Sequence, residues 1–252
     1  GRKLTGAEKV RAEEEIRNAF ALLIDRNYIV NDVSKKGEIP ASSFVAMGLT
    51  DADGSQFYEN AGPDPSYVGY YDVKEDAYEA NWEKALTTLK KYYTFDESTQ
   101  KFTDVPKLMY LYNTNDNHKA IAEAVQSTLS GIGISMDLQN QEFATFVETR
   151  KKGDYFVARN GWLGDYNDPI SFLDMWITGS GNNDVQFGKG ANKQLAAYSI
   201  DCTDLGYDLK AENATWAETY DEVIKLIKSE SDKDKRYALM HKAEDLLMST
   251  DD

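Results

Sequence analysis

Residues 107–162 alternate between short apolar runs typical of strands and amphipathic stretches typical of helices. The helical stretches repeat apolar side chains every three or four positions, and Gly131 and Gly153 follow them as expected at helix ends. The predicted strands are 108–112, 134–138 and 155–158, and the predicted helices between them are 117–130 and 142–152. This order, with connections of this length, predicts an α/β fold with right-handed crossovers between parallel strands.

The rest of the chain predicts mainly helices. Asp168-Pro169 is expected to begin a helix that continues to Trp176, and residues 37–72 lack any sustained period and are expected to form a long ordered loop. The other predicted helices span residues 7–26, 74–92, 216–228 and 232–248. No internal repeat and no Pro- or Ser-rich linker divides the sequence, so we expect one domain over residues 1–252.

Charge and cysteine content exclude several classes of protein. The 28 basic and 43 acidic residues give a net charge of -15, which disfavours nucleic acid and anionic lipid as partners. No run of about 18 apolar residues is present, so no membrane-spanning helix is expected. The one cysteine, Cys202, excludes an intrachain disulfide and a zinc site built on several cysteines. We expect no metal ion and no cofactor.

Ligands of open parallel sheets bind beyond the carboxyl ends of the strands. Those ends correspond to residues 113–118, 139–143 and 159–167, which are therefore predicted to be neighbours. Their chemically useful side chains are His118, Glu142, Phe143, Arg159, Trp162, Asp165 and Tyr166. A carboxylate can accept bonds from an ammonium, an arginine can bind a carboxylate, and aromatic faces pack on apolar groups. The set is suited to a zwitterionic or peptide-like ligand.

Each candidate also has a purely structural interpretation. Trp162 can be a core residue, and Asp165 can cap the following turn. Arg150 and Arg159 are by default partners in surface ion pairs, and His118 can be a solvated polar residue in the first turn of a helix. The functional interpretation therefore depends on the convergence of these residues.

Signatures of an enzyme are weak. The two histidines, His118 and His241, do not form an HExxH motif, and no motif joins either of them to Cys202. Gly188-Lys189-Gly190 lacks the spacing of a phosphate-binding loop, and Asp51-Ala52-Asp53-Gly54 lacks the full set of acidic positions of a calcium loop. We expect no catalytic residues.

Several long segments resemble the oligopeptide-binding proteins of bacterial ABC importers, a family of extracellular solute-binding proteins. The central segment runs from Leu111-Tyr-Asn-Thr-Asn-Asp-Asn-His118 through Gln139-Asn-Gln-Glu-Phe143 to Arg159-Asn-Gly-Trp162-Leu-Gly-Asp165-Tyr-Asn-Asp-Pro169. The similarity covers most of residues 10–185 and 216–248. It implies one lobe, the second, of a two-lobed periplasmic-binding-protein type II fold, with a mixed, largely parallel sheet flanked by helices. Residues from about 187 to 215 depart from the family and are expected to be an insertion.

The resemblance also implies roles for individual residues. Asp165 matches the aspartate that pairs with the α-ammonium of the peptide, and Trp162 and Phe143 match aromatic pocket positions. Many members have Trp at the position of Phe143, so the shape of that pocket is expected to differ. Arg159, Arg150 and His118 match positions that can meet the carboxylates of peptides of different lengths.

The function implied is peptide binding for import, outside the cytoplasm, in the periplasm or as a cell-surface lipoprotein. The implied partners are a peptide ligand, the permease of the ABC transporter and the missing first lobe of the same protein. Three alternatives stay open at this point. They are a binder of a dipeptide, nickel or a sugar on the same scaffold, a hydrolase or transferase acting on a small zwitterion, and a structural interaction domain.

Overall fold

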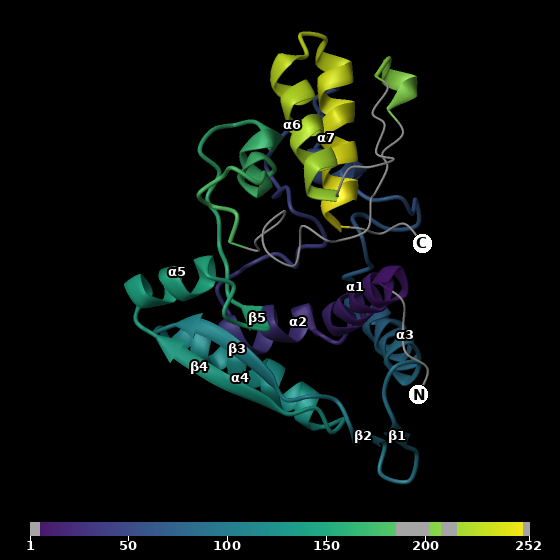
Figure 1. The fold of residues 1–252 in the computed structure, drawn as a ribbon, viewed down its shortest axis with the longest axis vertical. Coiled ribbons are helices and arrows are strands. Elements are labelled where there is room, and N and C mark those ends of the chain that lie inside the picture. The colour runs from purple at the N-terminus through teal and green to yellow at the C-terminus, as the bar shows by residue number, and fades with distance from the viewer. Residues whose placement is uncertain (1–5, 185–201, 208–215, 249–252) are drawn as a thin grey trace. The chain divides into compact units, whose positions relative to one another are not determined.

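The computed structural model describes residues 6–184, 202–207 and 216–248 (Figure 1). The chain divides into two compact units. Unit 1 comprises Gly1–Pro40 and Asp72–Gly161, and unit 2 comprises Ala41–Tyr71 and Trp162–Asp252. The single α/β lobe expected over residues 1–252 stays a prediction. The insertion expected at about 187–215 lies outside the described residues, apart from residues 202–207.

The sheet of unit 1 has β3 (Leu108–Asn113) at its centre. This strand pairs in parallel with β4 (Met136–Gln141) along its whole length and with β5 (Val157–Ala158) on its other side. The strand order is therefore β4-β3-β5. The prediction of parallel strands joined by crossovers is confirmed, although β4 begins two residues later and β5 is shorter than expected.

Two helices connect these strands, as predicted. α4 (Asp116–Ser130) leads from β3 to β4, and α5 (Phe143–Lys151) leads from β4 to β5. The chain moves outward from the centre of the sheet in the first crossover and back past the centre in the second. Right-handed crossovers in opposite directions place the two helices on opposite faces of the sheet. On the α4 face, Val125 and Leu129 pack with Leu108 and Met136 in the core.

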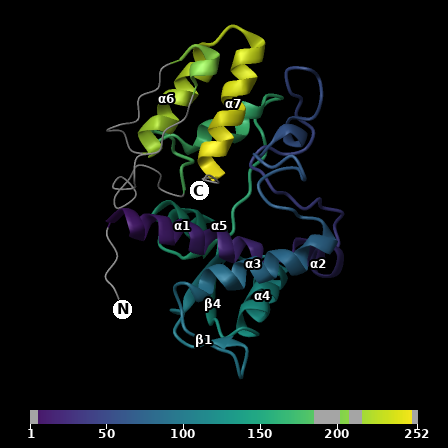
Figure 2. The same ribbon diagram turned by 90° about the vertical axis from the view of Figure 1, so that its right-hand side faces the viewer.

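Further helices complete unit 1. α1 (Gly6–Leu22) and α3 (Tyr78–Lys90) lie side by side (Figure 2). Their buried residues, among them Ala19 and Leu89, belong to the same core as the α4 face of the sheet. The helix predicted over residues 7–26 ends earlier, at Leu22, and is followed by the short α2 (Arg26–Tyr28) and a π-helical turn (Ile29–Ser34). A two-stranded antiparallel ribbon, β1 (Phe95–Asp96) and β2 (Lys101–Phe102), follows α3.

Unit 2 is built on two helices that follow each other closely in the chain. α6 (Trp216–Ser229) and α7 (Lys233–Met248) pack together, and both agree with the predicted bounds to within one residue. Their apolar faces form the core with 3-10 turns from the loops. The core residues from the two helices are Ala217, Tyr220, Val223, Ile224, Ile227, Leu239, Met240, Ala243, Leu246 and Leu247. Within the described ranges, no helix is both long enough and apolar enough to cross a membrane.

The helix predicted from Asp168 to Trp176 is wrong in type. The segment forms two 3-10 turns, Pro169–Phe172 and Asp174–Trp176. Its carbonyl groups are bonded by side chains instead of by amides further along a helix. Trp162 Nε1 donates to the carbonyl of Ser171 at 2.7 Å, and the Tyr220 hydroxyl donates to that of Leu173. Tertiary contacts of unit 2 therefore override the local helical pattern.

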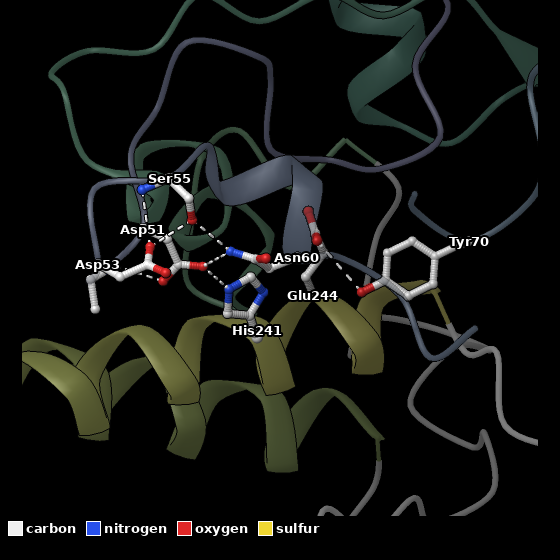
Figure 3. Close-up of polar contacts among 8 residues, drawn as sticks. Asp51, Asp53, Ser55, Asn60, Tyr70, His241 and Glu244 are labelled. Carbon is white, nitrogen blue, oxygen red and sulfur yellow. Dashed lines mark hydrogen bonds and ion pairs between the residues drawn. The ribbon is translucent and has the colours of Figure 1, made fainter. Parts of the chain in front are cut away.

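The long loop over residues 41–71 is held to α7 by polar contacts (Figure 3). The backbone N–H of Val45 donates to Glu244 Oε2 at 2.8 Å, and the Tyr70 hydroxyl donates to Asp245 Oδ1 at 2.6 Å. One turn earlier on α7, His241 Nε2 lies 2.5 Å from Asp51 Oδ2. The His241 ring also stacks on Phe57, with ring centroids 3.8 Å apart. These contacts give fixed structure to a segment without helices longer than one turn.

Burial raises the pKa of Glu244 from its ordinary value of 4.5 to about 7. The folded protein therefore keeps this proton between about pH 4.5 and 7, whereas the unfolded chain releases it. Over that range the contribution of Glu244 to the free energy of unfolding falls as the pH rises, and it is constant above about pH 7.

Glu244→Gln removes this ionisation and keeps an oxygen for the Val45 N–H. On going from pH 5 to pH 8, the free energy of unfolding of the variant should rise relative to that of the unmodified protein by about 2–3 kcal/mol. One pKa unit corresponds to about 1.4 kcal/mol. Urea denaturation at both pH values measures the gain. Glu222→Gln on the exposed side of α6 is the control and should show none. Parallel pH dependence in the Glu244→Gln variant and the unmodified protein would contradict the assignment.

Candidate functional site

The carboxyl ends of the three parallel strands lie at one edge of the unit 1 sheet. β3 leads into α4, where Asn115 accepts a hydrogen bond from the N–H of His118 at 3.1 Å and caps the helix. β4 leads into α5, which begins at Phe143, and β5 leads into Arg159. The structure therefore brings His118, Phe143 and Arg159 to the same edge, as the parallel topology predicted.

A hydrogen bond links Arg150 to the backbone of Arg159. The N–H of Arg159 donates to the carbonyl of Leu111 at 2.8 Å, which continues the pairing of β5 with β3. From α5, Arg150 Nη1 donates to the carbonyl of Arg159 at 3.1 Å. The Arg150 guanidinium also lies over the Phe146 ring, 4.9 Å from its centroid. Two arginines are thus held at the end of the third strand by backbone and aromatic contacts.

The electrostatics of this edge are positive. Burial, and then the charge of Arg150, lower the pKa of Arg159. Burial, and then the charges of Arg159 and Lys36, lower the pKa of His118 from 6.5, so its imidazole is neutral at pH 7. No carboxylate of the described residues contributes to either shift. The edge can therefore accept a carboxylate from a ligand.

Two further polar groups at this edge were missed by the sequence analysis. Asn113 and Gln141 form the last register pair of β3 and β4, so their side chains lie on the same face of the sheet. Asn113 Oδ1 and Gln141 Oε1 are buried and have no hydrogen-bond partner among the described residues. An unsatisfied buried acceptor costs about 1–3 kcal/mol. A ligand N–H that reached these oxygens would remove that cost. In the sequence, a polar residue at the end of each of two paired strands is the signal that could have identified them.

Phe143 presents an open apolar surface. It is 59% exposed although its neighbour Phe146 on the same helix is buried, and the two ring centroids are 6.3 Å apart. An exposed aromatic ring beside polar strand ends is suited to contact an apolar part of a ligand.

Trp162 and Asp165 belong to unit 2. Trp162 is half-buried against the core of that unit, and its indole N–H is bonded to Ser171. Asp165 is exposed. The loop between them and the first 3-10 turn is braced by Arg236 Nη1, which donates to Asp168 Oδ2 at 2.8 Å. The structure therefore supports a partly structural role for Trp162, and it leaves the carboxylate of Asp165 open to solvent.

Three carboxylates surround Tyr166. Burial raises the pKa of Tyr166, and Asp174, Asp168 and Asp165 raise it further. Asp168 is paired with Arg236, and Asp174 Oδ2 lies 3.7 Å from Lys228 Nζ. The side chain of Asp165 makes no ion pair with any described residue. Asp165 is thus the member of this group that is available to a cation from outside.

The candidates of unit 1 are His118, Phe143, Arg150 and Arg159, and those of unit 2 are Trp162 and Asp165. That they form one rim stays a prediction. Within the part of the chain that the structure describes, no group of three or more His, Cys, Asp and Glu side chains is arranged to hold a metal ion.

Removing a positive charge near His118 tests the arrangement of the edge. We expect Arg159→Gln to raise the pKa of His118, because the charge of Arg159 disfavours the imidazolium in the unmodified protein. Proton NMR titration of the two histidine rings measures this directly, and the His241 signal is an internal reference. Lys119→Gln is the matched control, since Lys119 pairs with Glu123 at 3.9 Å on the exposed side of α4. An unchanged His118 titration in Arg159→Gln would contradict the proposed proximity.

Comparison with known proteins adds independent findings. The family described as bacterial extracellular solute-binding proteins, family 5 middle, matches residues 6–184. The chain is similar to the dipeptide-binding protein DppE of Bacillus subtilis, 32% identical over 237 residues, which are 94% of this chain and 35% of that protein. It is also similar to the periplasmic oligopeptide-binding protein OppA of Salmonella typhimurium, 34% identical over 192 residues, which are 75% of this chain and 31% of that protein.

A solved structure agrees with the fold. The murein tripeptide-binding protein MppA of Escherichia coli matches with a TM-score of 0.67 and 26% identity, over 96% of this chain and 38% of that chain. The chain thus spans about a third of the length of these three relatives. The solute-binding-protein fold implied by the sequence resemblance is confirmed for this part.

Proposed function

Since the chain belongs to the family 5 extracellular solute-binding proteins, which bind solutes and are not enzymes, we propose that it is the peptide-binding lobe of an ABC importer component. Relatives named for oligopeptide, dipeptide and murein peptide binding support a peptide ligand. The binding component would act outside the cytoplasm, in the periplasm or as a surface lipoprotein. Its other partners would be the first lobe of the same protein and the permease.

The observation that carries the proposal is the state of Asp165. Of the three carboxylates near Tyr166, Asp168 and Asp174 have basic partners, whereas Asp165 has none among the described residues. Its loop is braced by the pair of Arg236 with Asp168, so the carboxylate is presented on a fixed segment. An α-ammonium is the cation that every unblocked peptide carries. Asp165 is therefore assigned to the peptide amino terminus.

The edge of the unit 1 sheet supports the other half of the ligand. Arg159, Arg150 and His118 are assigned to the peptide carboxylate, at positions that differ with peptide length. Asn113 and Gln141 can accept hydrogen bonds from peptide N–H groups, which do not depend on the side chains of the ligand. Phe143 and the exposed part of Trp162 provide apolar contacts, and bridging waters adapt the remaining space to different side chains.

Asp165→Asn in the two-lobed parent protein tests the assignment to the ammonium. We expect free-amine peptides to bind more weakly by ~2–5 kcal/mol, because a charge in the complex loses its partner. N-acetylated versions of the same peptides should lose far less. Titration calorimetry of both peptide types gives the two differences, and Asp154→Asn at an exposed position of unit 1 is the control. Equal losses for the two peptide types would reject the role of Asp165.

We further expect the 252-residue chain alone to bind peptides far more weakly than the two-lobed parent. Closure of a second lobe adds contacts and excludes water. Without it, the ion pair at Asp165 stays solvated and contributes at most ~1 kcal/mol, which does not offset the several kcal/mol lost in immobilising a flexible peptide. Calorimetry with one peptide and both proteins decides the point. Tight binding by this chain alone would contradict the two-lobe mechanism.

A further inference from the structure

Gly161, the last residue of unit 1, lacks a side chain at a point where one would meet Arg159. A Cβ atom placed on Gly161 would lie 2.9 Å from Arg159 Nη2 and 3.4 Å from Arg159 Cζ. The three atoms nearest to that position all belong to the Arg159 guanidinium, and real Cβ atoms essentially never lie within 3.0 Å of such an atom. The guanidinium therefore occupies the space that a side chain at position 161 would take.

The backbone does not require glycine at position 161. Gly161 is not among the glycines with positive φ, so its conformation is open to other residues. Gly164 shows a different reason for glycine, since a Cβ atom there would lie 2.8 Å from the Phe172 ring and 3.0 Å from Ser171 Oγ. Phe172 packs against the core of unit 2, so Gly164 serves core packing. Gly161 instead leaves room for a residue of the candidate site.

Hydrogen bonds fix the backbone on which the guanidinium lies. The N–H of Arg159 donates to the carbonyl of Leu111 at 2.8 Å, and the Arg159 carbonyl accepts from Arg150 Nη1 at 3.1 Å. The N–H of Gly161 donates to Asn160 Oδ1 at 2.8 Å. Within the described ranges, the Arg159 guanidinium itself makes no ion pair and donates no hydrogen bond. Its position therefore depends on the room that Gly161 leaves.

We infer that Gly161 is a positioning residue for Arg159, because its missing side chain gives the guanidinium a place against the backbone at the end of β5. The inference rests on the proposed peptide-binding function and adds a residue on which the carboxylate site depends. The planar guanidinium can meet both oxygens of a carboxylate. A guanidinium that is held in place before the ligand arrives loses less entropy on binding than one that moves freely in water.

Gly161→Ala in the 252-residue chain tests the placement. The added methyl group displaces the guanidinium toward water, where its charge acts less on His118. The pKa of His118 should therefore rise, in the same direction as in Arg159→Gln but by less. Proton NMR titration of the His118 ring measures the change. Asp116 and Glu142, at the starts of α4 and α5, are the same in all proteins compared, so the differences report on Arg159.

A double variant and a control make the titration specific. Adding Gly161→Ala to Arg159→Gln should change the pKa of His118 no further, because a glutamine side chain ends before the position of Cζ. Gly131→Ala is the matched control at the far end of α4, where φ is -58°. A Cβ atom there would lie 3.4 Å from the nearest atom, the Thr128 carbonyl oxygen, which is an ordinary contact. This variant should leave the pKa of His118 unchanged.

The two-lobed parent protein gives a second readout, the binding of the peptide carboxylate. In a series of short peptides of increasing length, the one whose binding Arg159→Gln weakens most is selected. Gly161→Ala should weaken the binding of that peptide about tenfold, which corresponds to the loss of one charge-assisted hydrogen bond. The same peptide with a carboxamide in place of the terminal carboxylate should lose less than about twofold, since it has no charge for Arg159 to meet. Titration calorimetry measures both losses.

Three results would overturn the inference. They are a pKa of His118 that stays the same in Gly161→Ala, an equal change with and without Arg159, and equal losses of affinity for the carboxylate and carboxamide peptides. Failure of the proposed function has a different signature. In that case the His118 titration changes as expected in the 252-residue chain, but Arg159→Gln weakens the binding of no peptide to the parent.

Discussion

The central position of β3 in the unit 1 sheet determines where the candidate side chains of that unit lie. β3 pairs in parallel with both β4 and β5, so all three strands end at the same edge. Each strand then leads directly into a residue with functional chemistry, either at the start of a helix or just beyond the strand. A site built in this way needs no long loop, because the backbone hydrogen bonds of the sheet fix the spacing of its groups.

The same arrangement keeps like charges close together. Burial, and then the charge of Arg150, lower the pKa of Arg159, and no carboxylate of the described residues contributes to that shift. The fold retains this unfavourable contact and compensates it in part with the bond from Arg150 to the Arg159 carbonyl. Groups that are desolvated and lie near like charges are typical of functional sites, where a ligand supplies the missing charge. The buried oxygens of Asn113 and Gln141 are uncharged, but they too lack a partner among the described residues that a ligand could supply.

Local pattern in the sequence was enough to predict the central α/β segment and both C-terminal helices. It was not enough where distant residues decide the structure. The carbonyl of Ser171 is bonded by the side chain of Trp162, so the segment after Pro169 forms 3-10 turns instead of the predicted helix. The loop over residues 41–71 is ordered by Glu244, about 200 positions away.

The acidic character of the chain and its positive edge act over different distances. A net charge of -15 repels an approaching carboxylate, but at physiological ionic strength exposed charges more than about 8 Å away are largely screened. Arg159 acts at short range and is partly buried, where screening is weaker. An acidic ligand therefore experiences this charge only when it is close to the edge of the sheet. Recognition of a carboxylate by such a protein depends on desolvated cations held by the fold, which is why the backbone pairing of β3 and β5 at Arg159 matters more than the overall charge.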